Sequence, residues 1–250
     1  MTPSKSTNKE REFQIPIPGT DLNIYAKQYG ELSDSMVIFV HGLTGHMDEH
    51  LFYNGARYFE KHGISSIRFN LYDWHDDARK LMDCTLETHA HDFNTVLQYL
   101  LTAKVKKIAA IGHSYGGPTI LLGNHKQLAA IVLWDPSHGD IFADEDEVKY
   151  VPELNAYHVN WGTSFLIGSP MRAMEKEIAW DSLTKKIHSA LKVVSAGKGE
   201  LVEHGKKYVD LANGPKQHVV IQSANHNFDD EGAADELYKE SASWIQKSIT

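Results

Sequence analysis

The chain is poor in cysteine and in long hydrophobic runs. Cys84 is the only cysteine among 250 residues, so no disulfide can form within the chain, as is typical of proteins from a reducing compartment. The longest apolar runs, such as LAAIVLW, are far shorter than the roughly 20 residues that a membrane-spanning helix needs. The polar N-terminal stretch MTPSKSTNKEREFQ has no apolar segment typical of a secretory signal. We therefore expect a soluble cytoplasmic protein with no membrane partner.

Positive charge is also scarce, because 25 Lys and Arg face 33 Asp and Glu, which gives a net charge of −8. Phosphate backbones are bound by clustered Lys and Arg, so a nucleic-acid partner is not expected. The 15 histidines do not follow zinc-ligand spacing, neither in residues 89–92 nor in residues 73–77. We expect no metal and no cofactor. The sequence leaves the oligomeric state open, a homodimer included.

Short apolar runs alternate with helical patterns along most of the chain, which predicts an α/β fold. We expect about eight strands in a mostly parallel sheet, with helices on both faces. The expected strands are 12–17, 22–29, 35–40, 64–71, 107–112, 128–134, 191–196 and 217–224. The expected helices are 49–62, 85–102 (with Thr85 as its N-cap), 115–125, 202–211 and 231–248.

The alternation lapses over residues 136–186, and a connection this long is usually functional. We expect a small cap or lid there, inserted into a core made of residues 13–135 and 187–250. Residues 1–12 are expected to form a flexible N-terminal tail.

A serine stands between glycines at Gly112-His113-Ser114-Tyr115-Gly116, where an apolar strand runs into a helix. This is the G-x-S-x-G pattern of a nucleophile elbow, in which a strained turn presents the serine and the glycines allow strand and helix to approach closely. We interpret Ser114 as a nucleophile. The alternative is a glycine-rich turn that serves packing alone.

A second turn follows an earlier apolar strand, at His41-Gly42-Leu43. A tetrahedral oxyanion needs two backbone N–H donors. The sequence offers the N–H of Tyr115, directly after the serine, and the N–H of Leu43.

The segments VIFVHGLTGH, IGHSYGG and SANHNF resemble the α/β-hydrolase superfamily, and most closely its small-lid carboxylesterases of the cinnamoyl or feruloyl esterase type. The resemblance covers residues 13–244 and is weakest between 136 and 186. It implies an acid and then a histidine after the serine, in that chain order.

Two of these positions can be assigned. His226 follows the last strand and is the expected base, accepting the proton of Ser114. Glu200 falls where the family usually has an aspartate after strand seven, and we expect it to be the acid. Asp135, one strand earlier, is the alternative, since some hydrolases place their acid there.

One segment departs from the family. After strand four the family often has an Arg-Gly-His-Gly turn, whereas residues 70–77 read NLYDWHDD, with no glycine. The acidic side chains in this segment are expected to disfavour anionic acyl groups nearby.

Together these features predict a serine hydrolase that cleaves small to medium carboxylic esters through an acyl-enzyme, with a small-molecule ester as its partner. We expect Trp134, Trp161 and Phe165 to line the substrate pocket. A peptidase, amidase or acyltransferase with the same triad remains an alternative, as does a non-catalytic binding protein, although the latter would be expected to lack one of these groups.

Overall fold

The computed structural model describes residues 9–249. Its larger sheet has eight strands, which lie side by side in the order β1 (Glu10–Pro16), β2 (Asn23–Tyr29), β4 (Ser65–Phe69), β3 (Ser35–Val40), β5 (Lys107–His113), β6 (Ala130–Trp134), β10 (Ala190–Ala196) and β11 (Lys216–Ile221). The pairings β1–β2 and β2–β4 are antiparallel, and the other five pairings are parallel. The predicted α/β fold with a mostly parallel eight-stranded sheet is confirmed.

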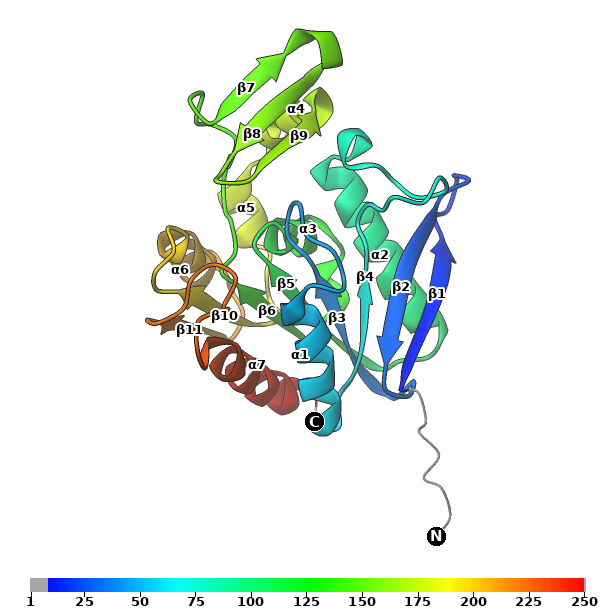
Figure 1. Cartoon of the computed structure of the whole chain (residues 1–250). Coiled ribbons are helices and arrows are strands. Elements are labelled where there is room, and N and C mark those ends of the chain that lie inside the picture. Colours follow the sequence, from blue (N-terminus) through cyan, green and yellow to red (C-terminus); the bar gives the residue numbers. More distant parts are fainter. Residues whose placement is uncertain (1–8, 250) are drawn as a thin grey trace.

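Helices cover both faces of this sheet because its central strands are apolar on both sides. In β3, Met36 and Ile38 belong to one hydrophobic core, whereas Val37 and Phe39 belong to the other, as the alternation of side chains along a strand requires. The helices of the first face are α2 (Leu86–Thr102), α3 (Gly116–Leu122) and α6 (Val202–Leu211). Those of the second face are α1 (His50–Lys61) and α7 (Ala233–Ile249), which lie side by side in Figure 1.

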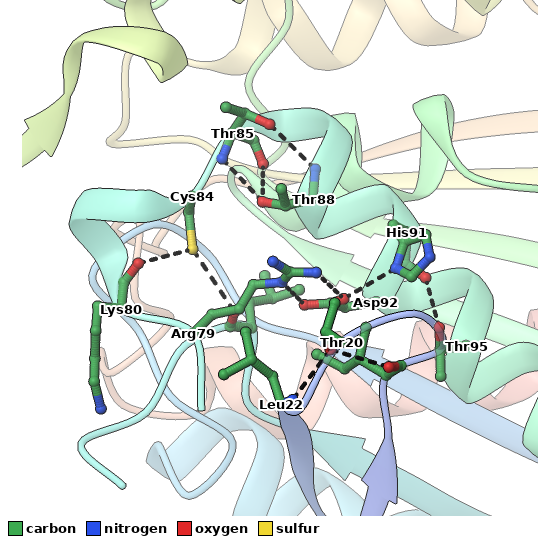
Figure 2. Close-up of polar contacts among 12 residues, drawn as sticks. Thr20, Leu22, Arg79, Lys80, Cys84, Thr85, Thr88, His91, Asp92 and Thr95 are labelled. Atoms are coloured by element: carbon green, nitrogen blue, oxygen red, sulfur yellow. Dashed lines mark hydrogen bonds and ion pairs between the residues drawn. The ribbon is translucent and has the colours of Figure 1, made fainter. Parts of the chain in front are cut away.

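The start of α2 shows how the sequence sets a helix boundary. The Thr85 hydroxyl accepts a hydrogen bond from the Thr88 N–H at 3.2 Å, and the Thr88 hydroxyl accepts one from the Thr85 N–H at 2.9 Å (Figure 2). This reciprocal capping box confirms Thr85 as the N-cap. One turn further, buried Asp92 binds the Arg79 guanidinium through both carboxylate oxygens, at 2.6 and 3.1 Å. The long loop between β4 and α2 is thereby anchored to the helix.

In the segment between β6 and β10, a small antiparallel sheet lies apart from the main sheet (Figure 1), whereas the last helix of the segment packs against the first face through Trp180 and Leu183. The segment contains a three-stranded antiparallel sheet and two helices: β7 (Val148–Val151), β8 (Ala156–Asn160), β9 (Ser164–Gly168), α4 (Ser169–Glu177) and α5 (Trp180–Thr184). Its small apolar core includes Phe142 and Met171, and Leu43 from the main domain packs against it. We call residues 136–186 the cap.

Residues 10–12, which were expected to belong to a flexible N-terminal tail, form the start of β1 instead. Residues 1–8 of that tail lie outside the described residues, and Glu10 already pairs with Tyr29 at the start of β1. No helix within residues 9–249 combines the length and the hydrophobicity needed to cross a membrane.

Candidate active site

The turn after β5 has the geometry that the G-x-S-x-G pattern predicts. Ser114 has a φ of 53°, a left-handed conformation that residues other than glycine rarely adopt. Its N–H is held by the carbonyl of Trp134 at 2.9 Å, and its own carbonyl accepts from the Gly117 N–H at 3.0 Å. The chain therefore turns sharply at Ser114, whose half-buried side chain stands between the end of β5 and the start of α3.

The glycines of this turn are required by space. A Cβ on Gly112 would come within 2.6 Å of the Gly116 backbone, and a Cβ on Gly116 within 2.3 Å of the carbonyl oxygen of Val40. Real Cβ atoms do not approach backbone so closely, so both positions exclude every other residue type without a backbone shift. The serine turn is thus pressed against the end of β3, which carries the second predicted turn.

His226 lies on the loop between β11 and α7, and its partner is Asp135. The Nδ1 atom of His226 lies 2.7 Å from Oδ2 of Asp135, which is fully buried at the end of β6. The other oxygen, Oδ1, accepts from the Ala196 N–H at 3.0 Å. Because the carboxylate accepts at Oδ2, the histidine carries its proton on Nδ1 and leaves Nε2 available as a base.

Glu200, the acid expected from the sequence, does not take this place. Its side chain is exposed, and among the described residues it has no ion pair or hydrogen bond with His226. The physical reason lies one residue earlier, at Gly199, where a Cβ would already lie 3.2 Å from Oδ2 of Asp135. The loop after β10 therefore packs its backbone against the Asp135 carboxylate and turns Glu200 outward, so the assignment of Glu200 to the histidine is corrected to Asp135.

A second histidine, His113, steadies the loop of His226 and was not singled out in the sequence. Its Nε2 donates to the His226 carbonyl at 2.9 Å, and the two rings lie 4.7 Å apart. Burial lowers the pKa of His113 to about 3, so the ring is neutral at physiological pH. The signal available in the sequence was only its place beside the serine, since its partner lies 113 residues away.

The second predicted turn, after β3, lies directly beside Ser114. A Cβ on Gly42 would be 3.0 Å from Cβ of Ser114. Within residues 9–249 neither the Leu43 N–H nor the Tyr115 N–H has a hydrogen-bond acceptor. Two unpaired donors therefore flank the serine from two chain segments, as an oxyanion site needs.

The ring of His41 holds this turn in place. Its Nε2 accepts from the Leu71 N–H at 3.0 Å, so its Nδ1 carries the proton and donates to the Gly42 carbonyl at 2.7 Å. Burial lowers the pKa of His41 to about 4, which keeps this neutral tautomer. The Gly42 peptide is thereby fixed with its carbonyl turned to His41.

The cap meets the serine turn at Tyr115. The carboxyl group of Glu175, on α4, lies beside the buried Tyr115 hydroxyl and is itself 1% exposed. Burial raises the pKa of Glu175 to about 8, a value that includes a lowering by the Tyr115 hydroxyl and a smaller raising by nearby Asp140, and the Ile141 N–H donates to its carboxyl group at 3.3 Å. Glu175 is thus largely neutral at pH 7. The sequence did not indicate this role for Glu175, because an acidic residue within a polar helix is normally interpreted as solvent-exposed.

The three expected pocket residues have different surroundings. Trp134 is fully buried between the sheet and the helices of the second face, and its Nε1 donates to the Ser241 hydroxyl at 2.8 Å. It is therefore a core residue, and its assignment to the pocket is wrong. Trp161 is 38% exposed, stacks on Phe142 at 5.5 Å and meets Phe165 edge-on. Trp161 and Phe165, the other two expected pocket residues, therefore pack within the cap.

No group of three or more His, Cys, Asp or Glu side chains in the described part of the chain is arranged to hold a metal ion.

Comparisons with solved structures find many chains of the same fold. A ferulic-acid complex of Est1E from Butyrivibrio proteoclasticus matches with a TM-score of 0.80 at 16% identity, covering 95% of this chain and 99% of that one. The esterase domain of a Rhodothermus marinus protein matches with 0.75 at 13% identity, covering 96% and 99%. Mouse alpha/beta hydrolase domain-containing protein 10 matches with 0.73 at 14% identity, covering 95% and 99%.

Comparison with curated protein sequences finds no match. The family model described as alpha/beta hydrolase fold matches residues 36–161, half of the chain. This range holds the serine turn, the preceding His41-Gly42 turn and Asp135. Because this family model matches half of the chain, the chain belongs to the α/β-hydrolase-fold family.

Proposed function

We propose that the protein is a serine hydrolase that cleaves carboxylic esters, with Ser114 as nucleophile, His226 as base and Asp135 as acid. The observation that carries this proposal is the 2.7 Å contact between His226 and Asp135, together with a serine that is held at a φ of 53° and whose N–H binds the carbonyl of Trp134, the residue before Asp135. A buried carboxylate on Nδ1 fixes the imidazole tautomer and stabilises the imidazolium that forms when Nε2 takes a proton.

The reaction proceeds in two halves. In the first, the Ser114 oxygen attacks the ester carbonyl carbon while His226 accepts its proton, and the Leu43 and Tyr115 N–H groups stabilise the oxyanion. The bond to the alcohol breaks, and the alcohol leaves with the proton held by His226. In the second half, His226 deprotonates water, which attacks the acyl-enzyme, releases the acid and restores Ser114.

Esters are favoured as the substrate class by the esterases among the similar structures. The apolar contact between Leu43 and the cap core further supports an acyl chain on that side of the serine. The partner on this proposal is a small-molecule ester.

The test is hydrolysis of a chromogenic ester series, acetyl through octanoyl, with a hydroxycinnamoyl ester and a matched amide. Ser114→Ala is expected to lose at least about 10³-fold in kcat. The control is Ser223→Ala, an exposed serine on the turn after β11, which is expected to retain wild-type rates. Wild-type protein that cleaves the amide and none of the esters would replace the esterase proposal by an amidase.

A further inference from the structure

The cap contacts both residues whose N–H groups are the proposed oxyanion donors. The Leu43 side chain packs against the apolar core of the cap, which contains Phe142 and Met171. The buried Tyr115 ring meets the ring of Phe142 at 6.3 Å and that of His89, on α2, at 5.9 Å. Two segments that lie far apart in the chain, each carrying one donor, are therefore packed against the same small layer.

The contact between the cap and Tyr115 also has a polar part, which Glu175 makes. The Glu175 carboxyl group lies beside the Tyr115 hydroxyl, and its Oε2 accepts from the Ile141 N–H at 3.3 Å. Oε1 of Glu175 and the Tyr115 hydroxyl are both buried, and neither atom has a well-aligned hydrogen bond among residues 9–249. A carboxylate here would lose its hydration without enough donors in exchange, so the neutral acid is the form that fits this place.

The charged groups around Glu175 leave a negative charge there largely uncompensated. The Arg172 guanidinium, one turn earlier on α4, donates to both carboxylate oxygens of Asp140, at 2.8 and 2.7 Å. Burial is the main reason that the pKa of Glu175 is raised, and among its charged neighbours Asp140 raises it by more than Arg172 lowers it. Burial also raises the pKa of the phenols of Tyr115 and Tyr208, so both phenols stay neutral. Glu175 is therefore the group in this contact that changes its charge near neutral pH.

Where α4 meets α2, the contact between the two helices is weak. The Met174 sulfur, a poor acceptor, accepts from the Glu87 N–H at 3.4 Å, and the Glu87 side chain is exposed. Lys176 and Glu177, which follow Glu175 in α4, are exposed as well. An ionised Glu175 would regain its hydration only if α4 moved away from Tyr115, whose ring would then lose its contacts with the cap.

We propose that Glu175 is a positioning residue: its neutral carboxyl group holds α4 against Tyr115 and thereby fixes the Tyr115 N–H that stabilises the oxyanion. Ionisation of Glu175 releases α4, so the closed cap and the complete oxyanion site form together. The proposal rests on the ester hydrolysis proposed above. Glu175 touches no reacting atom and acts through Tyr115.

The experiment is the pH dependence of kcat for a butanoyl ester in wild type, Glu175→Gln and Glu177→Gln, after subtraction of the uncatalysed rate. With a pKa of about 8, about nine-tenths of the Glu175 carboxyl groups are protonated at about pH 7 and about one-tenth at about pH 9. In wild type, kcat should therefore fall about tenfold between these pH values, with KM changed less than about twofold, and should recover when the pH is returned to 7.

The variants separate Glu175 from other titrating groups. Glu175→Gln has a neutral side chain at every pH and should lose the alkaline fall in kcat. Glu177→Gln, which removes an exposed carboxyl group from the same helix, is the matched control and should keep this fall. Glu175→Ala, with folding verified by a thermal melt, should lower kcat about tenfold at about pH 7, whereas Glu175→Gln should stay within about twofold of wild type.

Hydrogen exchange of residues 169–177 in Ser114→Ala protein tests the contact without hydrolysis. At about pH 9, protection in α4 should be several-fold lower in Ser114→Ala than in the double variant that also carries Glu175→Gln. A wild-type kcat that does not fall above about pH 8, or that falls equally in Glu175→Gln, would overturn the proposal.

The two readouts also distinguish this proposal from the proposed function. Protein that cleaves no ester, but in which α4 loses protection only when Glu175 is present, contradicts the proposed function and supports the contact between the cap and Tyr115. An active esterase in which α4 is equally protected with and without Glu175 contradicts this proposal alone.

Discussion

The Asp135 carboxylate and the His226 imidazole meet at 2.7 Å across 91 residues of chain. The order of the strands explains this contact, because only β10 lies between β6 and β11 in the sheet. The N–H of Ala196, at the end of β10, holds the second carboxylate oxygen. Three neighbouring strand ends therefore fix this carboxylate and this imidazole, the proposed acid and base, relative to each other, at the carboxyl edge where parallel sheets place their chemistry.

Gly42→Ala should reduce catalysis while the fold is retained. The added methyl group would lie 3.0 Å from Cβ of Ser114 and 3.3 Å from the His113 carbonyl, so the turn that presents the Leu43 N–H must move. Loss of one oxyanion donor lowers kcat by about 10²–10³. Steady-state kinetics on a butanoyl ester, with a thermal melt to verify folding, checks this. A folded variant with wild-type kcat would remove Leu43 from the oxyanion site.

Trp134→Phe should destabilise the protein by about 1–3 kcal/mol, because it removes a buried hydrogen bond to Ser241 and part of a fully buried ring. The matched control is Trp161→Phe, at a 38% exposed ring on the cap, which should stay within about 0.5 kcal/mol of wild type. Urea unfolding measures both. A stable Trp134→Phe protein with a changed preference for acyl length would return Trp134 to the pocket.

The fold could be predicted from the sequence because its strands are short, apolar runs with helical patterns between them. The run SMVIFV is buried on both faces in β3 as expected. The elbow at Ser114 was also predictable, because it depends on residues that are adjacent in the sequence.

The partner of His226 was harder to predict. Asp135 and Glu200 both follow a strand that ends near the site, and a sequence does not state which way a loop turns its side chains. The close approach of Gly199 to Asp135 is a tertiary contact with no local signature. Trp134 was wrongly assigned to the pocket for a related reason. Side chains alternate between the two faces along β6, but the sequence does not show which of these faces lies away from the pocket.

Glu175 should make stability depend on pH. Burial raises its pKa to about 8 in the folded protein, against an ordinary value of 4.5, so the folded state binds this proton more tightly than the unfolded state. The stabilisation is complete below about pH 4.5 and is lost as the pH rises to about 8. Glu175→Gln keeps a neutral side chain at every pH and should avoid this loss.

Thermal melts of wild type and Glu175→Gln at pH 5.5 and pH 8.5 test this. The Tm of the variant minus the Tm of wild type should be several degrees more positive at pH 8.5 than at pH 5.5. About 1 kcal/mol of stability corresponds to about 2–4 °C in a domain of this size. The other titrating groups are common to both proteins and cancel in the comparison. A Tm difference that is independent of pH would show that the carboxyl does not titrate in this range.

The most direct test of the account is the rate of ester hydrolysis by Asp135→Asn and Glu200→Gln, measured side by side with wild type. Both substitutions replace a carboxylate by an amide of nearly the same shape, at a fully buried position in one case and an exposed one in the other. The account predicts that Asp135→Asn loses about 10⁴-fold in kcat, because the histidine is left in the wrong tautomer, and that Glu200→Gln stays within about threefold of wild type. A fully active Asp135→Asn protein, or an inactive Glu200→Gln protein, would contradict the triad proposed for this chain.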